Sequence, residues 1–555
     1  MFVFMITLNK VHSRPAKGVE KRQFGKAAVA TDIPECSELA TSILKEGGSA
    51  VDAAITSILY IGLVNGQTSG IGGGSFMLLY DRKSKNAEYI DARVSAPAAT
   101  TRDMYNHNHI SNKYGALAIA TPGEVKGMWE AHQKYGKLSW KRLFEPVIEL
   151  ARRGFKVTNH GAMSLKLLVE MAGEGPQNHV LGIMLLSFVF KAWKDLYFKN
   201  NGARPKEEGD IVIRSNYADT LQRIADNGWT EFYNGTTADM IIEDMKLYNG
   251  ILTKADLQNY NVRWSDVITT PFLGNTIYSP SLPSGGVLNQ LASKDFAKEI
   301  QDKINSELEY PKIEFATKNQ NTNDVGNAGS TSHVSILAEN GDAVSVTTSV
   351  NFYYGCKIMS ATSGIIYNSM MSNFTIPNMP TNGGKAIAEA NYPAPNKRPL
   401  STMCGSFILD KNDDVRFVIG SSGGNQIITA NAWVTLVTLA TDTSLMQAIE
   451  WHRIHTDYEE EGVSYEDGVP QTVITGLLEL GHNIKPIDKR SFAVVQAILK
   501  DKSGIDTVIT GLLELGHNIK PIDKRSFAVV QAILKDKSGI DAYSDSRKLG
   551  KPAGY

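Results

Sequence analysis

The stretch TSHVSILAENGDAVSVTTSVNFYYG at 331–355 decides the fold, because two alternating runs of apolar and polar residues flank an Asn-Gly pair at 340–341. Such alternation is typical of half-buried strands, and Asn-Gly between two strands favours a tight hairpin. A two-residue turn predicts that Thr331 faces Val350 across the pair of strands. The chain therefore changes at Thr331 from a loose, polar tract (317–330) to a well-defined sheet.

Thr331 lies at the mouth of this hairpin, and the predicted register places Ser349 and Asn351 beside it. A threonine at such a position is usually an ordinary strand residue. If the bond between residues 330 and 331 is cut, however, an α-amino group with a pKa near ~8 lies next to the threonine hydroxyl. One residue then supplies both nucleophile and base. His333, two residues further on, is interpreted as a structural or supporting residue.

Three other polar residues are candidates for binding a carboxylate. Ser401 and Thr402 lie in RPLSTMC (398–404), where adjacent hydroxyls either donate to an anion or form a Ser/Thr turn. Arg93 ends AEYIDAR (87–93), where its guanidinium either binds a carboxylate or joins a surface ion pair. The residues alone leave these alternatives open.

The glycine-rich stretch GSSGG at 420–424 supports two interpretations. The backbone N–H groups of Gly423 and Gly424, which precede a helical pattern, could form an oxyanion hole. The same stretch also matches the G-x-S-x-G motif of α/β-hydrolases, with Ser422 as the nucleophile. That second interpretation lacks a preceding series of parallel βαβ units, and its triad partners would be Asp442 or Glu450 followed by His452 or His455.

Composition excludes several classes of protein. With 57 Lys and Arg against 58 Asp and Glu, the net charge is −1, so no electrostatic excess favours a nucleic acid partner. Cys36, Cys356 and Cys404 are too scattered for a disulfide framework or a zinc site, and no metal or organic cofactor is expected. No run reaches the roughly 18 to 20 apolar residues of a membrane span. The apolar segment 180–190 fits a buried element or an insertion, and 1–8 is a poor signal peptide that could be a truncated anchor.

An exact tandem repeat lies near the end of the chain, where residues 472–506 recur letter for letter at 507–541. Solenoids need about three or more divergent units, so two identical copies indicate a recent duplication or an assembly error. One copy is predicted to be redundant to the fold.

Several blocks occur in order along most of the chain, among them TSGIGGGSFMLLYD (68–81), IDARVSAP (90–97), the hairpin at 331–355, RPLSTMCGSFIL (398–409) and VIGSSGGNQIITA (418–430). Together they resemble the γ-glutamyltranspeptidase (glutathione hydrolase) family. The resemblance implies an α/β fold, the αββα sandwich of N-terminal-nucleophile hydrolases. It also implies one precursor that cuts itself into a large subunit, 1–330, and a small subunit, 331–555, which carries the nucleophile.

The resemblance assigns a role to each candidate. Thr331 is the nucleophile, and Ser349 supports it at a position where the family often has a second threonine. The amides of Gly423 and Gly424 bind the oxyanion, which leaves Ser422 as a turn residue. Arg93 holds the α-carboxylate of the γ-glutamyl group, and Asn351 contacts its α-amino end. The expected substrate-binding residues are Arg93, Ser349, Asn351, Ser401, Thr402 and Gly424.

The implied reaction is cleavage of the γ-glutamyl amide of glutathione and its conjugates through a threonine ester. Water or an amino acid or dipeptide then accepts the γ-glutamyl group. The family usually acts at the cell surface from an N-terminal anchor, so the resemblance implies a cell-surface or extracellular location, with an anchor that we expect to be missing or truncated in this chain.

Four features depart from the family pattern. Met370 and Asn373 replace two acidic residues that pair with the substrate ammonium, and a block is skipped near 288–291. Cys36 lacks its usual cysteine partner, and Tyr60 stands there instead. The alternative function is therefore a catalytically impaired homologue with a non-enzymatic or vestigial role.

Overall fold

The structure is a computed structural model. It describes residues 19–21, 23–173, 188–200, 204–285, 329–377, 389–441, 443–456 and 462–487. Beyond these it describes strands at 494–501, 504–506, 508–510, 529–536, 539–544 and 553–554. The apolar segment 1–8, the skipped block near 288–291, nearly all of the tract 317–330 and most of 180–190 lie outside the described residues.

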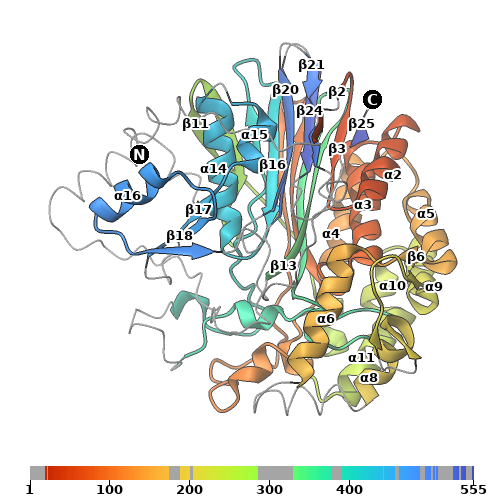
Figure 1. Ribbon diagram of the computed structural model, residues 1–555. Coiled ribbons are helices and arrows are strands. Elements are labelled where there is room, and N and C mark those ends of the chain that lie inside the picture. The colour runs from red at the N-terminus through yellow and green to blue at the C-terminus, as the bar shows by residue number, and fades with distance from the viewer. Residues whose placement is uncertain are drawn as a thin grey trace.

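Two sheets form the centre of the molecule (Figure 1). The first has seven strands, in the order β10 (Arg263–Ser265), β5 (Asn86–Ala92), β4 (Gly74–Asp81), β14 (Ala343–Phe352), β13 (Gly329–Leu337), β3 (Ala28–Ala30) and β25 (Ala553–Gly554). The main path of the second is β1 (Val19–Lys21), β22 (Val508–Thr510), β24 (Gly539–Ser544), β23 (Val529–Asp536), β16 (Val415–Ser422), β15 (Ser406–Leu409), β12 (Asn275–Pro280) and β11 (Val267–Phe272). Three further strands pair off this path: β2 (Gln23–Phe24), β20 (Val494–Asp501) and β21 (Gly504–Asp506).

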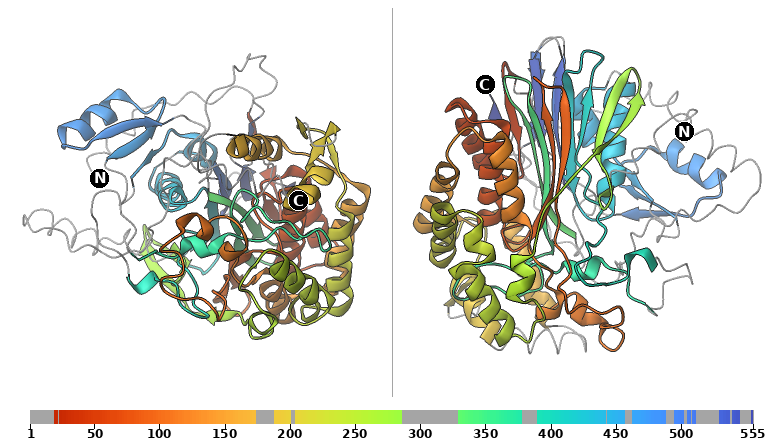
Figure 2. Two further views of the ribbon diagram at one scale, coloured as in Figure 1. Left: turned by 90° about the horizontal axis from the view of Figure 1, so that it is seen from below. Right: turned by 180° about the vertical axis from the view of Figure 1, so that it is seen from behind.

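Helices cover the outer face of each sheet, as the two views of Figure 2 also show. The seven-stranded sheet is covered by α2 (Pro34–Lys45), α3 (Ala50–Val64) and α4 (Glu124–Tyr135), and α5 (Trp140–Arg153) packs against α3. Further helices on this side are α6 (Asn159–Gly173), α8 (Phe188–Tyr197), α9 (Ser215–Asn227), α10 (Thr230–Tyr233), α11 (Thr236–Leu247) and α12 (Lys254–Gln258). The other sheet is covered by α14 (Gln426–Ala440) and α15 (Leu445–Glu450). The predicted αββα sandwich is therefore confirmed.

Alternation along β4 shows how the sequence fills the layers. Phe76 and Leu78 point into the space between the sheets, where they join Phe407 of β15 in one buried cluster. Met77 and Leu79 point the other way and join the cluster under the helices. Successive side chains of a strand face opposite sides, so one buried strand feeds two cores.

The helix that covers the centre of this sheet, α3, begins with a capping box. The Ser49 side chain accepts a hydrogen bond from the backbone of Asp52, whose carboxylate accepts one from the backbone N–H of Ser49. This capping box satisfies two N–H groups at the start of α3. The whole helix is buried, which fits its almost uninterrupted apolar sequence.

The hairpin of β13 and β14 differs from the prediction by one residue. Ala338 pairs with Asp342, so the loop has three residues rather than two, and Gly341 adopts a φ of 89°. A type of three-residue hairpin loop needs such a left-handed residue, for which glycine is suited. Thr331 therefore faces Ser349 directly instead of Val350, and an irregularity between Ser330 and Thr331 shifts the register beyond that point.

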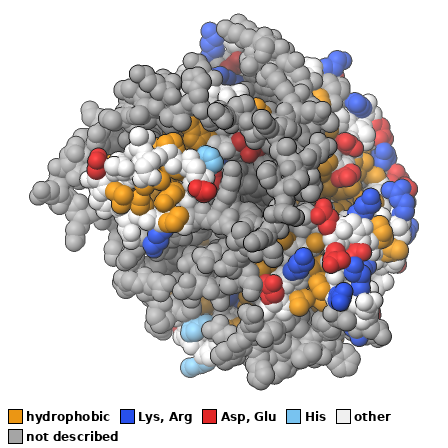
Figure 3. Space-filling model, viewed as in Figure 1, with side chains coloured by type: hydrophobic (Ala, Val, Ile, Leu, Met, Phe, Trp, Pro, Cys, Tyr) orange, Lys and Arg blue, Asp and Glu red, His pale blue; other side chains and the backbone are white. Residues whose placement is uncertain are grey.

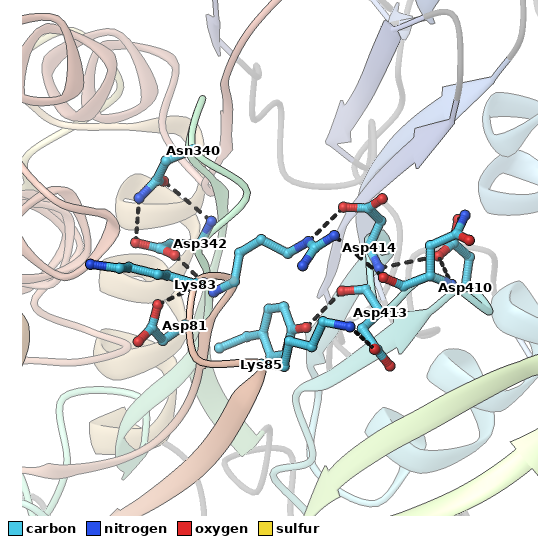
Figure 4. Close-up of polar contacts among 11 residues, drawn as sticks. Asp81, Lys83, Lys85, Asn340, Asp342, Asp410, Asp413 and Asp414 are labelled. Atoms are coloured by element: carbon cyan, nitrogen blue, oxygen red, sulfur yellow. Dashed lines mark hydrogen bonds and ion pairs between the residues drawn. The ribbon is translucent and has the colours of Figure 1, made fainter.

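Polar contacts join the two sheets at the end where their turns meet (Figure 4). The Arg82 backbone N–H donates to Asp342 over 2.9 Å, and its side chain forms an ion pair with Asp414 over 2.7 Å. Lys85 forms a second ion pair, with Asp413, over 2.7 Å. The two ion pairs connect the β4–β5 turn to the β15–β16 turn of the other sheet, and the contact with Asp342 connects it to the β13–β14 turn of its own sheet.

Both copies of the tandem repeat supply strands. The first copy contains most of α16 (Gln471–Glu479), β19 (Ile484–Ile487) beside β18 (Val463–Glu466), and β20. In the second copy, β23 occupies the place beside β16. The helical segment of the first copy has no described helical counterpart in the second.

On the face drawn in Figure 3, Lys and Arg side chains alternate with Asp and Glu side chains over the helical layer. Within the described part of the chain, every helix is too short or too polar to cross a lipid bilayer. The cell-surface location stays a prediction.

Candidate active site

Thr331 lies near the start of β13, where its side chain is 6% exposed. Its hydroxyl donates to Ser349 Oγ over 3.3 Å, across the pair of strands. Ser349 Oγ in turn donates to the carbonyl oxygen of Ser330 over 2.6 Å. The carbonyl of the predicted cleavage site thus accepts a hydrogen bond from the residue beside the predicted nucleophile.

Asn351 follows on the same strand and has an unusual backbone, with a φ of 81°. Its N–H donates to Ser349 Oγ over 2.8 Å, and its side-chain amide donates to Ser372 Oγ over 2.7 Å and to the Ser369 carbonyl over 3.1 Å. Backbone strain of this kind clusters at functional sites and persists only where several contacts hold it.

Arg93, directly after β5, is linked to Asn351 through the side chain of Asn373. Its Nη2 donates to Asn373 Oδ1 over 2.7 Å, and Asn373 Nδ2 donates to Asn351 Oδ1 over 3.1 Å. Arg93 Nη2 also lies 3.4 Å from the carbonyl oxygen of Leu400. The guanidinium is buried, and this burial lowers the pKa of Arg93 from its usual value to about 10.

Ser401 and Thr402 follow Leu400 in the loop before β15, and Thr402 contacts the glycine turn. Thr402 Oγ1 donates to the carbonyl of Gly424 over 2.9 Å, while Ser401 Oγ accepts from the Met403 backbone over 3.2 Å. Gly423 and Gly424 connect β16 to α14 with φ values of 133° and 63°, a backbone that favours glycine.

Six of the predicted residues lie along a series of contacts: Thr331, Ser349, Asn351, Arg93, Thr402 and Gly424. It runs from Thr331 through Ser349 and Asn351 to Asn373 and Arg93, and from Leu400 to the loop that holds Gly424. The contacts come from β13, β14 and three loop segments, and Arg93, which follows β5, joins them from 280 positions before Asn373.

Two residues that position Arg93 were missed by sequence reasoning. Arg398 Nη1 donates to Asp91 Oδ1 over 2.6 Å and to the carbonyl of Arg93 over 3.2 Å. Asp91 Oδ1 also accepts from the Arg93 backbone N–H over 2.9 Å. This buried pair spans 307 positions, so no local pattern could have revealed it.

His333 lies two residues beyond Thr331, buried between the sheets. Its ring nitrogens contact Thr347 Oγ1 over 2.8 Å and Ser335 Oγ over 3.1 Å. A Cβ added at Gly420 would lie 2.1 Å from the ring, so β16 approaches it closely. Burial lowers the pKa of His333 to about 3, which keeps the ring neutral and agrees with the structural role expected for it.

Met370 is buried in an apolar cluster with Val94, Tyr105, Met371 and Phe374. Its side chain therefore offers no acceptor for a cation.

The thiols of Cys36, Cys356 and Cys404 are buried and form no disulfide, and burial raises the pKa of each to about 12. Within the described residues, no group of three His, Cys, Asp or Glu side chains is arranged to hold a metal ion.

The alternative with Ser422 as nucleophile requires an α/β-hydrolase sheet. The strand that carries Ser422, β16, is antiparallel to both of its neighbours, β15 and β23. The nucleophile of an α/β-hydrolase follows a strand of a mainly parallel sheet, so this alternative is wrong.

A sequence model of the family described as Gamma-glutamyltranspeptidase matches residues 36–290 and 287–511. The chain belongs to this family. It is 33% identical to Scoloptoxin SSD14 of Scolopendra dehaani over 523 residues, covering 83% of this chain and 87% of the relative. It is 31% identical to Glutathione hydrolase 3 of Arabidopsis thaliana over 535 residues, covering 85% and 80% of the two chains.

Among solved structures, a cephalosporin acylase from Bacillus halodurans superimposes with a TM-score of 0.76 over 98% of each chain. Its sequence is 18% identical, so the similarity concerns the fold. The predicted family, the N-terminal-nucleophile hydrolase fold and the assignment as an enzyme are confirmed by these matches.

Proposed function

We propose that this protein is a self-cleaving γ-glutamyl hydrolase and transferase that works through an ester on Thr331. The observation that carries the proposal is the pair of hydrogen bonds from Thr331 to Ser349 and from Ser349 to the Ser330 carbonyl. Membership of the family and the names of the relatives support the reaction class.

Cleavage of the precursor begins with attack of Thr331 Oγ on the carbonyl carbon of Ser330. Negative charge develops on the carbonyl oxygen, to which Ser349 Oγ already donates over 2.6 Å. The C–N bond breaks, an ester to Thr331 Oγ forms, and water releases residues 1–330. Thr331 is left with a free α-amino group.

In turnover, the same hydroxyl attacks the γ-amide of glutathione or a conjugate. The α-amino group of Thr331 accepts the hydroxyl proton and returns it to the leaving amine. The amides of Gly423 and Gly424 bind the oxyanion, a contribution of roughly 3 to 4 kcal/mol per donor. Arg93, with Ser401 and Thr402, holds the carboxylate of the acyl group. Water or an amino acid or dipeptide then accepts that group.

A second candidate is a homologue with impaired activity on γ-glutamyl substrates. The observation in its favour is that Met370 is buried among apolar residues and that Asn373 is neutral. Neither residue supplies a negative charge for a substrate ammonium.

The test is to purify the full chain and measure its size and activity. Our proposal predicts fragments of residues 1–330 and 331–555, transfer from an amide donor to water, and loss of both in Thr331→Ala. The matched control is Thr236→Ala in α11, which carries the same change far from the cleavage site in sequence. An uncut chain with normal turnover would contradict the proposal.

A further inference from the structure

The charges around Arg93 do not balance within the described residues. Arg93 and Arg398 are both buried, and among the residues that the structure describes Asp91 is the one carboxylate that forms an ion pair or hydrogen bond with either of them. Asp91 already forms an ion pair with Arg398 over 2.6 Å. This cluster of three side chains therefore carries one net positive charge.

The other described groups at the site are neutral. Asn373 and Asn351 present amides, Ser372 and Ser401 present hydroxyls, and Met370 is packed in an apolar cluster. The Arg93 Nε atom is buried and has no hydrogen-bond partner among the described residues. A buried guanidinium with an unused donor favours an anionic ligand.

We infer that the site prefers acyl groups that carry a carboxylate and no ammonium, such as the glutaryl group, over the γ-glutamyl group itself. This inference rests on the proposed function and names the substrate class of the same site. A carboxylate satisfies the excess charge of Arg93. An α-ammonium beside this carboxylate adds a second positive charge near that of Arg93. Asn373 does not offset this charge, because its Oδ1 already accepts from Arg93 and its Nδ2 donates to Asn351.

The chemistry is unchanged by the missing ammonium. Thr331 Oγ attacks the amide carbonyl of a glutaryl amide, the C–N bond breaks, and the proton passes through the Thr331 amine to the leaving amine. Water then cleaves the glutaryl ester and releases glutarate, so atoms and charges balance without any further reactant.

Glutaryl p-nitroanilide and γ-glutamyl p-nitroanilide form a matched pair of probes, because they differ only at the α-carbon. The processed wild-type protein is expected to show a kcat/KM about tenfold or more higher for the glutaryl compound. Asn373→Asp restores a carboxylate and is expected to reverse the preference. Asn227→Asp, at the exposed end of α9, makes the same charge change away from the site and is expected to leave the preference unaltered.

If the Asn373→Asp variant does not cleave itself into subunits, inhibition of the wild-type protein tests the preference instead. Glutarate is then expected to inhibit the wild-type protein at a lower concentration than L-glutamate. A wild-type preference for the γ-glutamyl anilide, or equal rates, overturns the inference and leaves the proposed function standing. Failure of the processed protein to cleave either anilide overturns the proposed function, and the inference with it.

Discussion

Replacing Asp91 with Asn tests how strongly the buried pair with Arg398 holds the carboxylate-binding part of the site. The two side chains are 1% and 5% exposed and lie 2.6 Å apart. Removing the charge of Asp91 leaves a buried guanidinium without its counter-charge, and breaking a buried pair in this way costs about 3 to 5 kcal/mol. We expect the free energy of unfolding to fall by that amount.

The matched control is Asp226→Asn. Asp226 forms an ion pair with Lys141 over the same 2.6 Å, but the two side chains are 39% and 55% exposed. Exposed pairs contribute little, because water solvates both charges after the pair is broken. The control variant should unfold at the wild-type urea concentration.

Both variants are best made in the Thr331→Ala background, which is expected to keep the chain in one piece so that unfolding does not depend on subunit dissociation. Urea unfolding followed by far-ultraviolet circular dichroism gives the midpoints. Equal losses in Asp91→Asn and Asp226→Asn would refute the argument that burial of the Asp91–Arg398 pair makes it important.

Three further changes have distinct expected results. Ser349→Ala removes the donor to the Ser330 carbonyl and should slow cleavage of the precursor about 100-fold or more in a gel time course. Ser349→Thr keeps a hydroxyl there and should keep the wild-type rate of cleavage. Equal rates of cleavage in the Ala variant and the wild type would contradict the role of Ser349 as donor. Gly420→Ala places a Cβ 2.1 Å from the His333 ring and should lower the free energy of unfolding by about 1 to 3 kcal/mol. Its control is Gly476→Ala in α16, where the added Cβ meets open space and should not destabilise the protein. Glu124→Gln should stabilise increasingly as pH rises. Burial raises the pKa of Glu124 from 4.5 to about 8, so the unfolded chain loses this proton at a lower pH than the folded chain. The stability of the wild-type protein therefore falls as the pH rises from about 4.5 to about 8, whereas that of the Gln variant lacks this fall. A gain in melting temperature that is independent of pH would contradict this expectation.

Local patterns predict much of the fold. The capping box of Ser49 and Asp52 fixes the start of α3, and the alternation on both sides of Asn340 predicts the hairpin. The register could not be predicted, because the choice between two and three loop residues depends on the backbone of Gly341 in the folded sheet. That single residue changes the partner of Thr331 from Val350 to Ser349.

The candidate site was predictable only in part. Thr331, Arg93 and Thr402 lie in recognisable blocks, and the structure connects them through contacts that a sequence pattern does not encode. Asn373 forms hydrogen bonds with both Arg93, 280 positions earlier in the sequence, and Asn351, 22 positions earlier. Which side chains share a buried charge depends on the complete packing of both sheets.

The most direct test of the account is to trap the acylated enzyme. The purified protein is mixed with an amide donor, quenched in acid and digested, and the acylated peptide is identified by mass spectrometry. We predict the acyl group on the hydroxyl of a peptide that begins with Thr331 and has a free α-amino group. Acylation of Ser422, or turnover by a protein whose bond between residues 330 and 331 is intact, would contradict the account.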